Sequence, residues 1–534
     1  MAIRLKKNGW IVLCTLIVAV ATVVMFSIRS GSKENVATTV KSESKSMFSS
    51  IFGKTTRDYI VLGLDTYSPW AGIVHLNGGL EPNENSLLYK LFGIKLKIMI
   101  VETNREPFLT GEVDVTFVTG DTRPIEMSEG SNMLDTRFIG IVNVSEGADA
   151  LVVNKTINTV ADLAGKRGAF PVGQAGHTLL IEVLESSGML SGDVSRVEDF
   201  LDDGKSIKVE SGIEAAQAMK ANQADFALVY APDDRDILKN VPGSKILFTT
   251  KQAPNIILDG FIVKESYLEK NFEKVAKLME AMFYSNVEMA TNDEFLKGAA
   301  KTFARAFGVN EDFVVEINAN GRIGYSVRDI VRFSTLGDNV NLFGFNYDYK
   351  GLTAEAIYNR MSVKYQQIGL ARRPLPYGRT INTSIIESLI QSNSLTNDQS
   401  ARRERTYVTP TTEVIAQATA VSNKKVVIEF NTGSYILDSN AQYIIDTEFA
   451  PIAKSFTNYI RVEGNTDNTG PADVNRELSR RRAQAAIDYL VKEHGISRDR
   501  FLPAVGNGST KAIAAGSIGA DRNYRSTDFQ LIAE

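Results

Sequence analysis

Short apolar runs separated by polar turns follow one another from residue 58 onward. Residues 59–64 form a run typical of a buried strand, and a second strand is predicted over 95–101. A third is predicted over 114–118 and ends at the polar turn 119–122. Helical stretches alternate with these strands. The alternation predicts an α/β domain with a mostly parallel sheet, whose ligand lies outside the carboxyl ends of the strands.

The same alternation of predicted strands and helices continues to about residue 395. Its main signals are the stretch 147–153, the segment 159–167, the loop 173–177 before a helix at 178–186, the strand 223–229 closing in Tyr230-Ala231-Pro232, and the return strand 256–263. Over 57–395 the chain resembles type 2 periplasmic substrate-binding proteins of the nitrate, sulfonate and thiamine-precursor group. The resemblance implies lobe 1 at about 57–150 and 255–395, and lobe 2 at about 151–254. Such lobes close on a small solute by rotation at their crossings.

This implied cleft suggests ligand contacts without identifying the ligand. The loop and helix start at 174–177 would present backbone N–H groups to an anion, whereas Asp121 would repel an anion and suits a cationic group. Trp70 offers either a stacking face or core packing, Ser68 a hydroxyl or a helix cap, and His177 a ligand contact or a local cap. The candidate ligand-binding residues are Ser68, Trp70, Thr119, Asp121, Gln174, Gly176, His177 and Tyr230.

The N-terminal segment is almost wholly apolar over 11–28. Eighteen helical residues extend ~27 Å, about the hydrocarbon thickness of a bilayer. Arg4, Lys6 and Lys7 precede the run and favour a cytoplasmic N-terminus. We expect a retained transmembrane helix in the inner membrane. A cleaved signal segment, cut near 19–21, remains the alternative, and both readings export the rest of the chain.

A second composition change separates the C-terminal part of the chain. Residues 29–56 and 396–423 are polar and are expected to be linkers, and the final domain is expected at 424–534. Its predicted elements are strands at 425–429, 460–463 and 528–532, a helix at 440–455, and a helix that starts near Asn475 and ends at His494-Gly495. On the last helix, Val474, Leu478, Ala485, Tyr489 and Leu490 are expected to share one apolar face.

The turn and helix at 464–484 carry the most specific pattern in the chain. Thr466-Asp467, then Asn475 with Leu478-Ser479 and Arg482-Ala483, then Asn523 with Arg525, resemble the OmpA-like peptidoglycan-binding domain. Asn465 stands where many relatives have His, and Tyr524 where many have a second Arg. The resemblance implies an α+β domain whose peptidoglycan-binding residues are Thr466, Asp467, Asn475, Arg482, Asn523 and Arg525.

The chemistry of the wall peptide fits one acid and one base in this motif. Diaminopimelate in the stem peptide carries an ammonium and a carboxylate on one centre. The resemblance implies Asp467 for the ammonium and Arg482, through two parallel hydrogen bonds, for the carboxylate. The alternative is a surface ion pair beside the exposed run Arg480–Arg482.

Composition excludes several other classes of function. A net charge of −4 on 534 residues gives no broad basic surface for nucleic acid. The single cysteine, Cys14, excludes an intrachain disulfide, and three scattered histidines give no His-based metal site. No Ser-His-Asp order, phosphate loop or metal-ligand spacing stands out, so we expect no enzyme and no cofactor. A wall-bound hydrolase or amidase is the enzymatic alternative.

The expected protein is therefore periplasmic and has three parts. An inner-membrane helix anchors it, a two-lobed domain binds a small solute, and the C-terminal domain binds peptidoglycan. A transporter or another envelope protein is a possible partner. The alternative is an envelope-spanning or stator-like link whose cleft no longer binds solute.

Overall fold

The computed structural model describes residues 57–102, 104–190, 207–310, 326–393, 395 and, with short gaps, 407–532. The elements given below belong to one compact unit that begins at Ile60. The expected anchor at 11–28 and the linker at 29–56 lie outside the described residues. Within the described ranges no helix has the length and apolar character needed to cross a bilayer.

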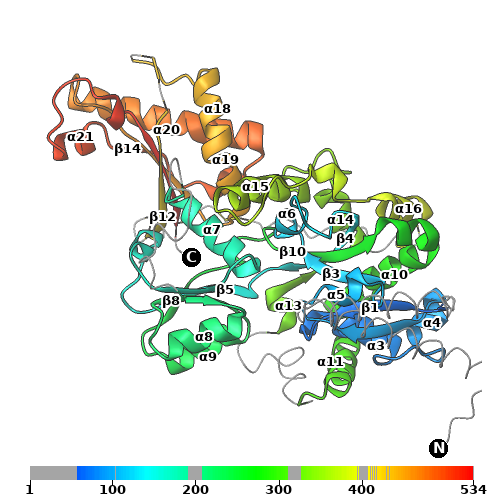
Figure 1. Cartoon of the computed structure of the whole chain (residues 1–534). Helices are drawn as coiled ribbons and strands as arrows, with labels where there is room; N and C mark the ends of the chain where they lie inside the picture. Colours follow the sequence, from blue (N-terminus) through cyan, green and yellow to red (C-terminus); the bar gives the residue numbers. More distant parts are fainter. Residues whose placement is uncertain are drawn as a thin grey trace, which may run out of the picture. The chain divides into compact units, whose positions relative to one another are not determined.

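Sheet 1 has the strand order β11-β4-β10-β3-β1-β2 and forms the core of the first lobe (Figure 1). Its strands are β1 (Ile60–Leu64), β2 (Leu96–Ile100), β3 (Val115–Thr119), β4 (Thr136–Ser145), β10 (Leu258–Lys264) and β11 (Val331–Phe333). β1 runs parallel to β2 and β3, while β10 runs antiparallel to β3 and β4. The three strands predicted between 59 and 118 are confirmed. β1 is apolar and buried along its whole length, whereas β2, at the edge of the sheet, is buried at alternate positions.

Helices enclose sheet 1 and complete its apolar core. They are α3 (Ala71–Asn77), α4 (Leu87–Phe92), α5 (Glu106–Leu109), α6 (Arg123–Glu126), α10 (Glu265–Thr291), α11 (Asp293–Phe307), α13 (Val327–Ile330), α14 (Leu336–Leu342), α15 (Ala354–Gln367) and α16 (Ser384–Ser392). Short 3₁₀ helices occur at Ser68–Trp70 and Tyr377–Arg379.

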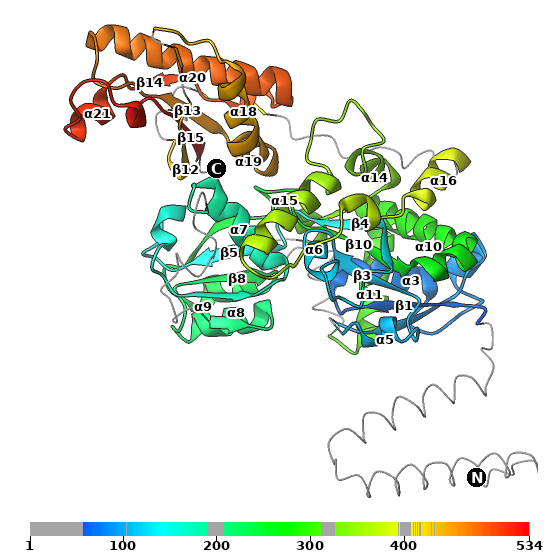
Figure 2. The ribbon, with the colours of Figure 1, turned by 45° about the horizontal axis from the view of Figure 1, so that its top comes forward.

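Sheet 2 has the order β7-β6-β8-β5-β9 and lies beside sheet 1 in both ribbon views (Figure 2). Its strands are β5 (Asp149–Val153), β6 (Gly168–Pro171), β7 (Ile207–Val209), β8 (Phe226–Tyr230) and β9 (Lys245–Thr249). Its helices are α7 (Ala175–Ser186), α8 (Gly212–Lys220) and α9 (Asp233–Asn240), with a 3₁₀ turn at Val160–Leu163. α7 covers one face of this sheet, and α8 and α9 cover the other (Figure 1).

The chain passes between the two sheets twice, near residue 147 and between 250 and 257. The Ser145 hydroxyl donates to Asp149 Oδ2 at 2.6 Å and lies 2.7 Å from Thr250 Oγ1. Thr250 Oγ1 also accepts from the Gly147 N–H at 2.8 Å. The two crossings expected near 150 and 255 are therefore present and are hydrogen-bonded to each other.

Sheet 3 has the order β12-β15-β13-β14 and forms the C-terminal domain. Its strands are β12 (Ala420–Val426), β13 (Ile460–Gly464), β14 (Val505–Gly506) and β15 (Thr527–Ile532). Its helices are α18 (Ser439–Glu448), α19 (Ala450–Ser455), α20 (Ala472–His494) and α21 (Thr510–Ala514), with 3₁₀ turns at Arg498–Arg500 and Arg522–Tyr524. β12 begins at Ala420, inside the segment expected to be linker, and residue 429 of the predicted strand 425–429 lies outside the described residues.

The helix predicted over 440–455 is two helices, α18 and α19. Phe449 lies between them with φ −125°, ψ −35°. Pro451, in the first turn of α19, has no N–H to donate to the carbonyl four residues earlier, so one continuous helix cannot form there.

The apolar face expected for α20 is buried at Leu490 but not along its whole length, and the helix ends at His494 before Gly495 in the left-handed region (φ 67°) as predicted. Val474 is 55 % exposed, whereas Asn475 and Ser479 are buried. The cause is close packing against β13. A Cβ on Gly464 would lie 2.0 Å from the Ser479 carbonyl oxygen, so only small side chains fit between the helix and the strand.

Candidate functional sites

Asp467 lies in the turn between β13 and α20, which Gly470 closes with a φ of 85°. The side chain is only 4 % exposed. The Arg525 Nε donates to Asp467 Oδ2 at 2.6 Å, and the Thr469 hydroxyl donates to Oδ1. Burial alone would raise the pKa of Asp467, but the hydrogen bonds from Thr469 and Arg525 outweigh it and lower the pKa. Asp467 is therefore an ionised acceptor at neutral pH.

Arg482 projects from α20 into the same site. Its Nε donates to the Ser434 carbonyl at 3.0 Å, and its guanidinium carbon lies 4.7 Å from the centre of the Phe430 ring. Burial and the neighbouring Arg525 lower the pKa of Arg482 to about 10, while the Asp467 carboxylate acts in the opposite direction. Its two Nη groups donate no hydrogen bond within the described part of the chain. A fixed guanidinium with both outer nitrogens unused matches a carboxylate ligand.

The remaining predicted wall-binding residues shape this site. The Asn475 amide donates to the Thr469 carbonyl at 2.8 Å and fixes the turn to the start of α20. Thr466 is buried, and its N–H donates to the Gly508 carbonyl at 2.8 Å. Asn523 is exposed in the turn before β15. Arg525 forms an ion pair with Asp467, with 2.6 Å between Nη2 and Oδ2.

The predicted solute-site residues at the start of α7 contact residues of their own lobe. Gln174 is the N-cap residue of α7, and its amide oxygen accepts from the Tyr230 hydroxyl at 3.4 Å. His177 is buried, and its Nδ1 accepts from the Gly173 N–H at 3.1 Å, which is the contact expected of a local cap. Gly176 packs against Leu228, whose Cβ would lie 3.1 Å from an added Cβ.

The predicted residues on sheet 1 lie at the carboxyl ends of β1 and β3. Ser68 opens the 3₁₀ turn after β1, and Thr119 is the last residue of β3, with its hydroxyl 2.7 Å from that of Thr122. Trp70 is 1 % exposed and stacks on Phe261 with ring centres 5.7 Å apart, so its rings pack in the core.

Asp121 connects the two lobes. Its Oδ2 accepts from the Thr178 hydroxyl of α7 at 2.5 Å, and Thr178 is 2.6 Å from the Tyr365 hydroxyl of α15. Burial raises the pKa of Asp121 to about 7. Helices from both lobes thus meet over this carboxyl group.

Sequence reasoning missed three further acids and a tyrosine around Asp121. Burial raises the pKa of Asp65 and of Asp149 to about 6. Burial, and then the charges of Asp149, Asp65 and Asp121, raise the pKa of Asp259 well above its usual range. The pKa of Tyr67 is raised by burial and by Asp259, Asp149 and Asp65. The signal available in the sequence was position: Asp65 follows one predicted strand, and Asp149 and Asp259 lie within two other predicted segments.

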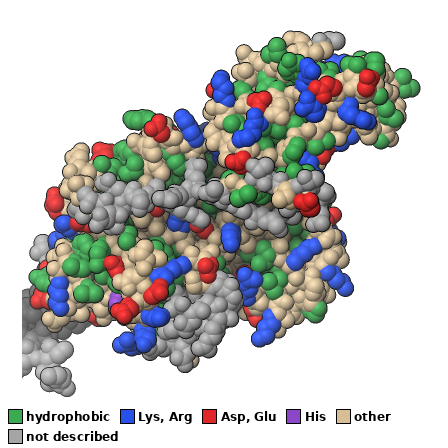
Figure 3. Space-filling model, turned by 180° about the vertical axis from the view of Figure 1, so that it is seen from behind, with side chains coloured by type: hydrophobic (Ala, Val, Ile, Leu, Met, Phe, Trp, Pro, Cys, Tyr) green, Lys and Arg blue, Asp and Glu red, His purple; other side chains and the backbone are tan. Residues whose placement is uncertain are grey.

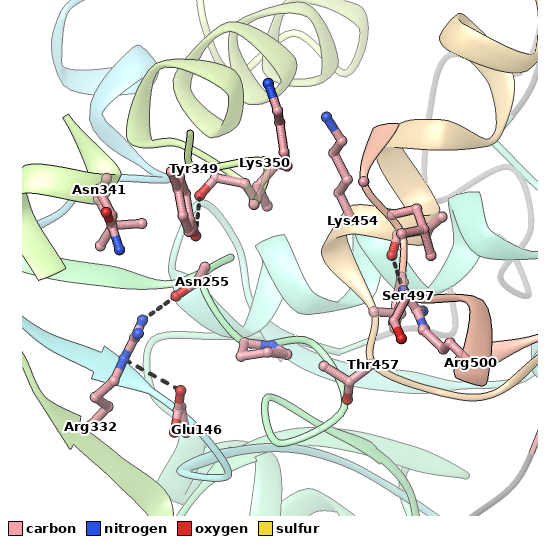
Figure 4. A pocket seen from close by; sticks show the side chains of 18 of the residues that line it. Glu146, Asn255, Arg332, Asn341, Tyr349, Lys350, Lys454, Thr457, Ser497 and Arg500 are labelled. Atoms are coloured by element: carbon pink, nitrogen blue, oxygen red, sulfur yellow. Dashed lines mark hydrogen bonds and ion pairs between the residues drawn. The ribbon is translucent and has the colours of Figure 1, made fainter. Parts of the chain in front are cut away.

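A separate pocket of about 260 Å³ is lined by several lysine and arginine side chains (Figure 4). Arg332 points toward Glu146, with 3.4 Å between Nε and Oε1, and toward Asn255. Lys350 and Lys454 also line it. None of the predicted solute-site residues lines this pocket.

The protein surface carries charges of both signs. On the face drawn in Figure 3, Lys and Arg side chains alternate with Asp and Glu. That distribution accords with the net charge of −4 and gives this face no basic stripe for nucleic acid.

Two family models match the chain. Residues 139–294 match the NMT1/THI5 like family, and residues 429–526 match the OmpA family. Outer membrane protein Omp38 of Acinetobacter baumannii is 32 % identical over 97 residues, which are 17 % of this chain and 26 % of that protein. The chain thus spans about a quarter of the length of this curated relative.

Solved structures resemble the two-lobed part. The periplasmic aliphatic sulphonate binding protein SsuA from Escherichia coli is 14 % identical, with a TM-score of 0.44 over 68 % of this chain and 100 % of its own. The nitrate-binding protein NrtA from Synechocystis PCC 6803 is 12 % identical, with a TM-score of 0.47 over 64 % of this chain and 91 % of its own. The desulfurization enzyme DSZB is 14 % identical, with a TM-score of 0.39 over 63 % and 100 %.

The two family matches fall on different sheets. The first covers sheet 2, both crossings and β10 of sheet 1, and the second begins after β12 and ends at the residue before β15, so that it contains β13 and β14 of sheet 3. The chain combines an NMT1/THI5-like, periplasmic-binding-protein-like domain with a C-terminal OmpA-family domain.

Proposed function

We propose that this protein is a periplasmic envelope protein that holds itself on peptidoglycan through its OmpA-family domain and captures a small solute between its two lobes. The placement of Asp467 and Arg482 in one site carries the first half of the proposal. An ionised acid and a guanidinium with two unused nitrogens complement the ammonium and the carboxylate of a diaminopimelate centre.

The N-terminal apolar segment 11–28 completes the proposal as an inner-membrane anchor. With the wall at one end and the membrane at the other, the two-lobed domain would deliver its solute to a transporter or report it to another envelope protein. We propose no catalytic activity for either domain.

Co-sedimentation of the full chain with purified sacculi tests wall binding. We expect Asp467→Asn and Arg482→Lys each to weaken binding by about 30-fold or more, since truncating one partner of a buried charge pair costs ~2–5 kcal/mol. Arg481→Ala is the matched control, because Arg481 neighbours Arg482 on α20 but is exposed and pairs with Glu477.

Sacculi whose stem peptides carry lysine in place of diaminopimelate sharpen the test. Lysine keeps the ammonium and lacks the carboxylate that Arg482 would bind, so wild-type binding should fall to the level of Arg482→Lys. Equal binding to both kinds of sacculi, or full binding by both site variants, would refute the assignment.

A further inference from the structure

Four aspartates converge on one edge of the two-lobed domain. Asp65 directly follows β1, and Asp121 lies two residues after the end of β3. Asp259, in β10, pairs with Thr119, the last residue of β3. Asp149 begins β5 opposite Tyr230, the last residue of β8. The carboxyl ends of the central strands and the two crossing strands therefore bring four acids to the position where such folds bind ligands.

Three of these acids are buried, Asp65 is half-buried, and their hydrogen bonds are only partly satisfied. Asp121, Asp149 and Asp259 are 0 %, 4 % and 9 % exposed. Oδ1 of Asp121 and Oδ1 of Asp149 lie within the protein without a hydrogen-bond partner. Among the described residues, Asp259 accepts no hydrogen bond and none of the four acids forms an ion pair. The Ser145 hydroxyl donates to Asp149 Oδ2, and the Thr178 hydroxyl donates to Asp121 Oδ2. The Trp70 indole N–H donates to Asp65 Oδ1 at 2.6 Å.

Burying several ionised carboxylates together costs free energy unless a positive charge lies nearby. An ionised carboxylate away from water is strongly disfavoured unless it is paired, and neighbouring carboxylates disfavour one another. No lysine or arginine of the described chain supplies the charge. Without a ligand the acids can be neutralised by protons, which accords with the raised pKa values of Asp121 and Asp259. A cation between the lobes would instead satisfy the unpartnered oxygens while they remain ionised.

The geometry favours an organic cation over a bare metal ion. Within the described residues no three acids, histidines or cysteines converge closely enough to hold a metal. Aromatic residues adjoin two of the acids, since the Trp70 indole N–H donates to Asp65 and Tyr230 pairs with Asp149 across β8 and β5. Separated carboxylates with aromatic neighbours suit a ligand whose N–H donors are spread over several atoms.

We propose that the cleft binds a small organic cation with N–H donors, an amine or guanidine, and rejects oxyanions. This inference rests on the proposed solute-binding function and specifies its ligand class. It decides between the two possibilities left open by the sequence, an anion at the start of α7 or a cation at Asp121, in favour of the cation.

The test is a thermal-shift and calorimetric screen of the full chain with probes matched in length. Alkyl amines, alkyl guanidines and 1,4-diaminobutane are compared with butanesulfonate, 1,4-butanedisulfonate and nitrate. We expect amines or guanidines to raise the melting temperature, as any ligand specific to the folded state does, and the anions to leave it unchanged.

Two isosteric variants connect the binding to the cluster. Asp149→Asn and Asp259→Asn should each weaken cation binding at least tenfold while the unliganded protein stays folded. Asp293→Asn, at an exposed acid of α11, is the matched control and should bind like wild type. Anion binding that survives Asp149→Asn would overturn the cationic class and leave solute capture intact. Absence of binding by probes of either charge would overturn solute capture itself.

Discussion

The pH dependence of the Asp149→Asn variant tests the burial of the acidic cluster through one of its members. Burial raises the pKa of Asp149 from 3.8 to about 6 in the folded protein. Below pH 3.8 the carboxyl group is protonated in both folded and unfolded chains, so it imposes no penalty. As pH rises from 3.8 through about 6, the unfolded chain gains by ionising first. The stability that the group contributes at low pH is therefore lost across that window.

The size of the effect follows from the difference between the two pKa values. The gap between 3.8 and about 6 corresponds to about 3 kcal/mol. Asparagine does not titrate, so its variant avoids this loss. Its amide nitrogen would take the place of Oδ1, which has no partner, at a cost of about 1–3 kcal/mol that is constant with pH. The informative quantity is the change with pH in the stability difference between variant and wild type.

Tryptophan fluorescence provides the assay. The chain has two tryptophans, Trp10 and Trp70, and Trp70 is stacked in the core of the first lobe. In a Trp10→Phe background, urea unfolding followed by fluorescence reports the two-lobed domain between pH 4 and 8. The lowered pKa of His75, due first to burial, adds an opposite trend below about pH 6.5, but it is present in both proteins and cancels.

We expect Asp149→Asn to gain about 3 kcal/mol relative to wild type between pH 4 and pH 8. A relative stability that stays constant within about 1 kcal/mol over this range would show that Asp149 ionises normally in the folded state. The burial argument for the whole cluster would then fail, whatever the ligand.

Two further predictions concern the OmpA-family domain, and thermal unfolding of the full chain by circular dichroism checks both. Gly464→Ala places a Cβ 2.0 Å from the Ser479 carbonyl oxygen and should destabilise the domain by about 3 kcal/mol, whereas Gly470→Ala, with open space but a φ of 85°, should cost about 1–2 kcal/mol. An equal loss in both would contradict the close-packing argument. The Arg500 guanidinium donates to the Asn458 carbonyl, 2.7 Å from Nε, and to the Ala453 carbonyl. Arg500→Met leaves both carbonyls without this donor and should lower the free energy of unfolding by at least about 2 kcal/mol. An unchanged melting temperature would show that these contacts are dispensable.

The strands of the two-lobed domain were predictable because their signal is local. Continuous apolar runs such as 59–64 form β1 within one residue of the predicted start, and the return strand 256–263 forms β10 with a shift of two residues at its start. Burial on both faces makes such strands apolar along their length, whatever their partners. The crossings near 150 and 255, by contrast, were implied by the family resemblance.

The buried face of α20 was not predictable from apolar periodicity, because that face is chosen by a backbone contact. Gly464 and Gly506 allow the strands to approach Ser479 and Arg476 so closely that no large apolar side chain fits there. Small and polar residues are therefore buried, while Val474 is exposed. The wall-binding roles predicted for Asp467 and Arg482 came instead from the order of residues in a known pattern, and they stay a prediction.

The acidic cluster could not be predicted from the sequence, for a different reason. Asp65, Asp149 and Asp259 are far apart in the sequence, and each alone looks like an ordinary polar residue at the end of a strand. Only the order of sheet 1 and the two crossings bring them to Asp121, and only burial makes their charge significant. Sheet order depends on pairing between strands that are far apart in the sequence. Which charged residues come together at the strand ends therefore depends on the topology. A fold alone therefore does not determine the charge of a ligand, and in the proposal above it is the acids at the strand ends that favour a cation.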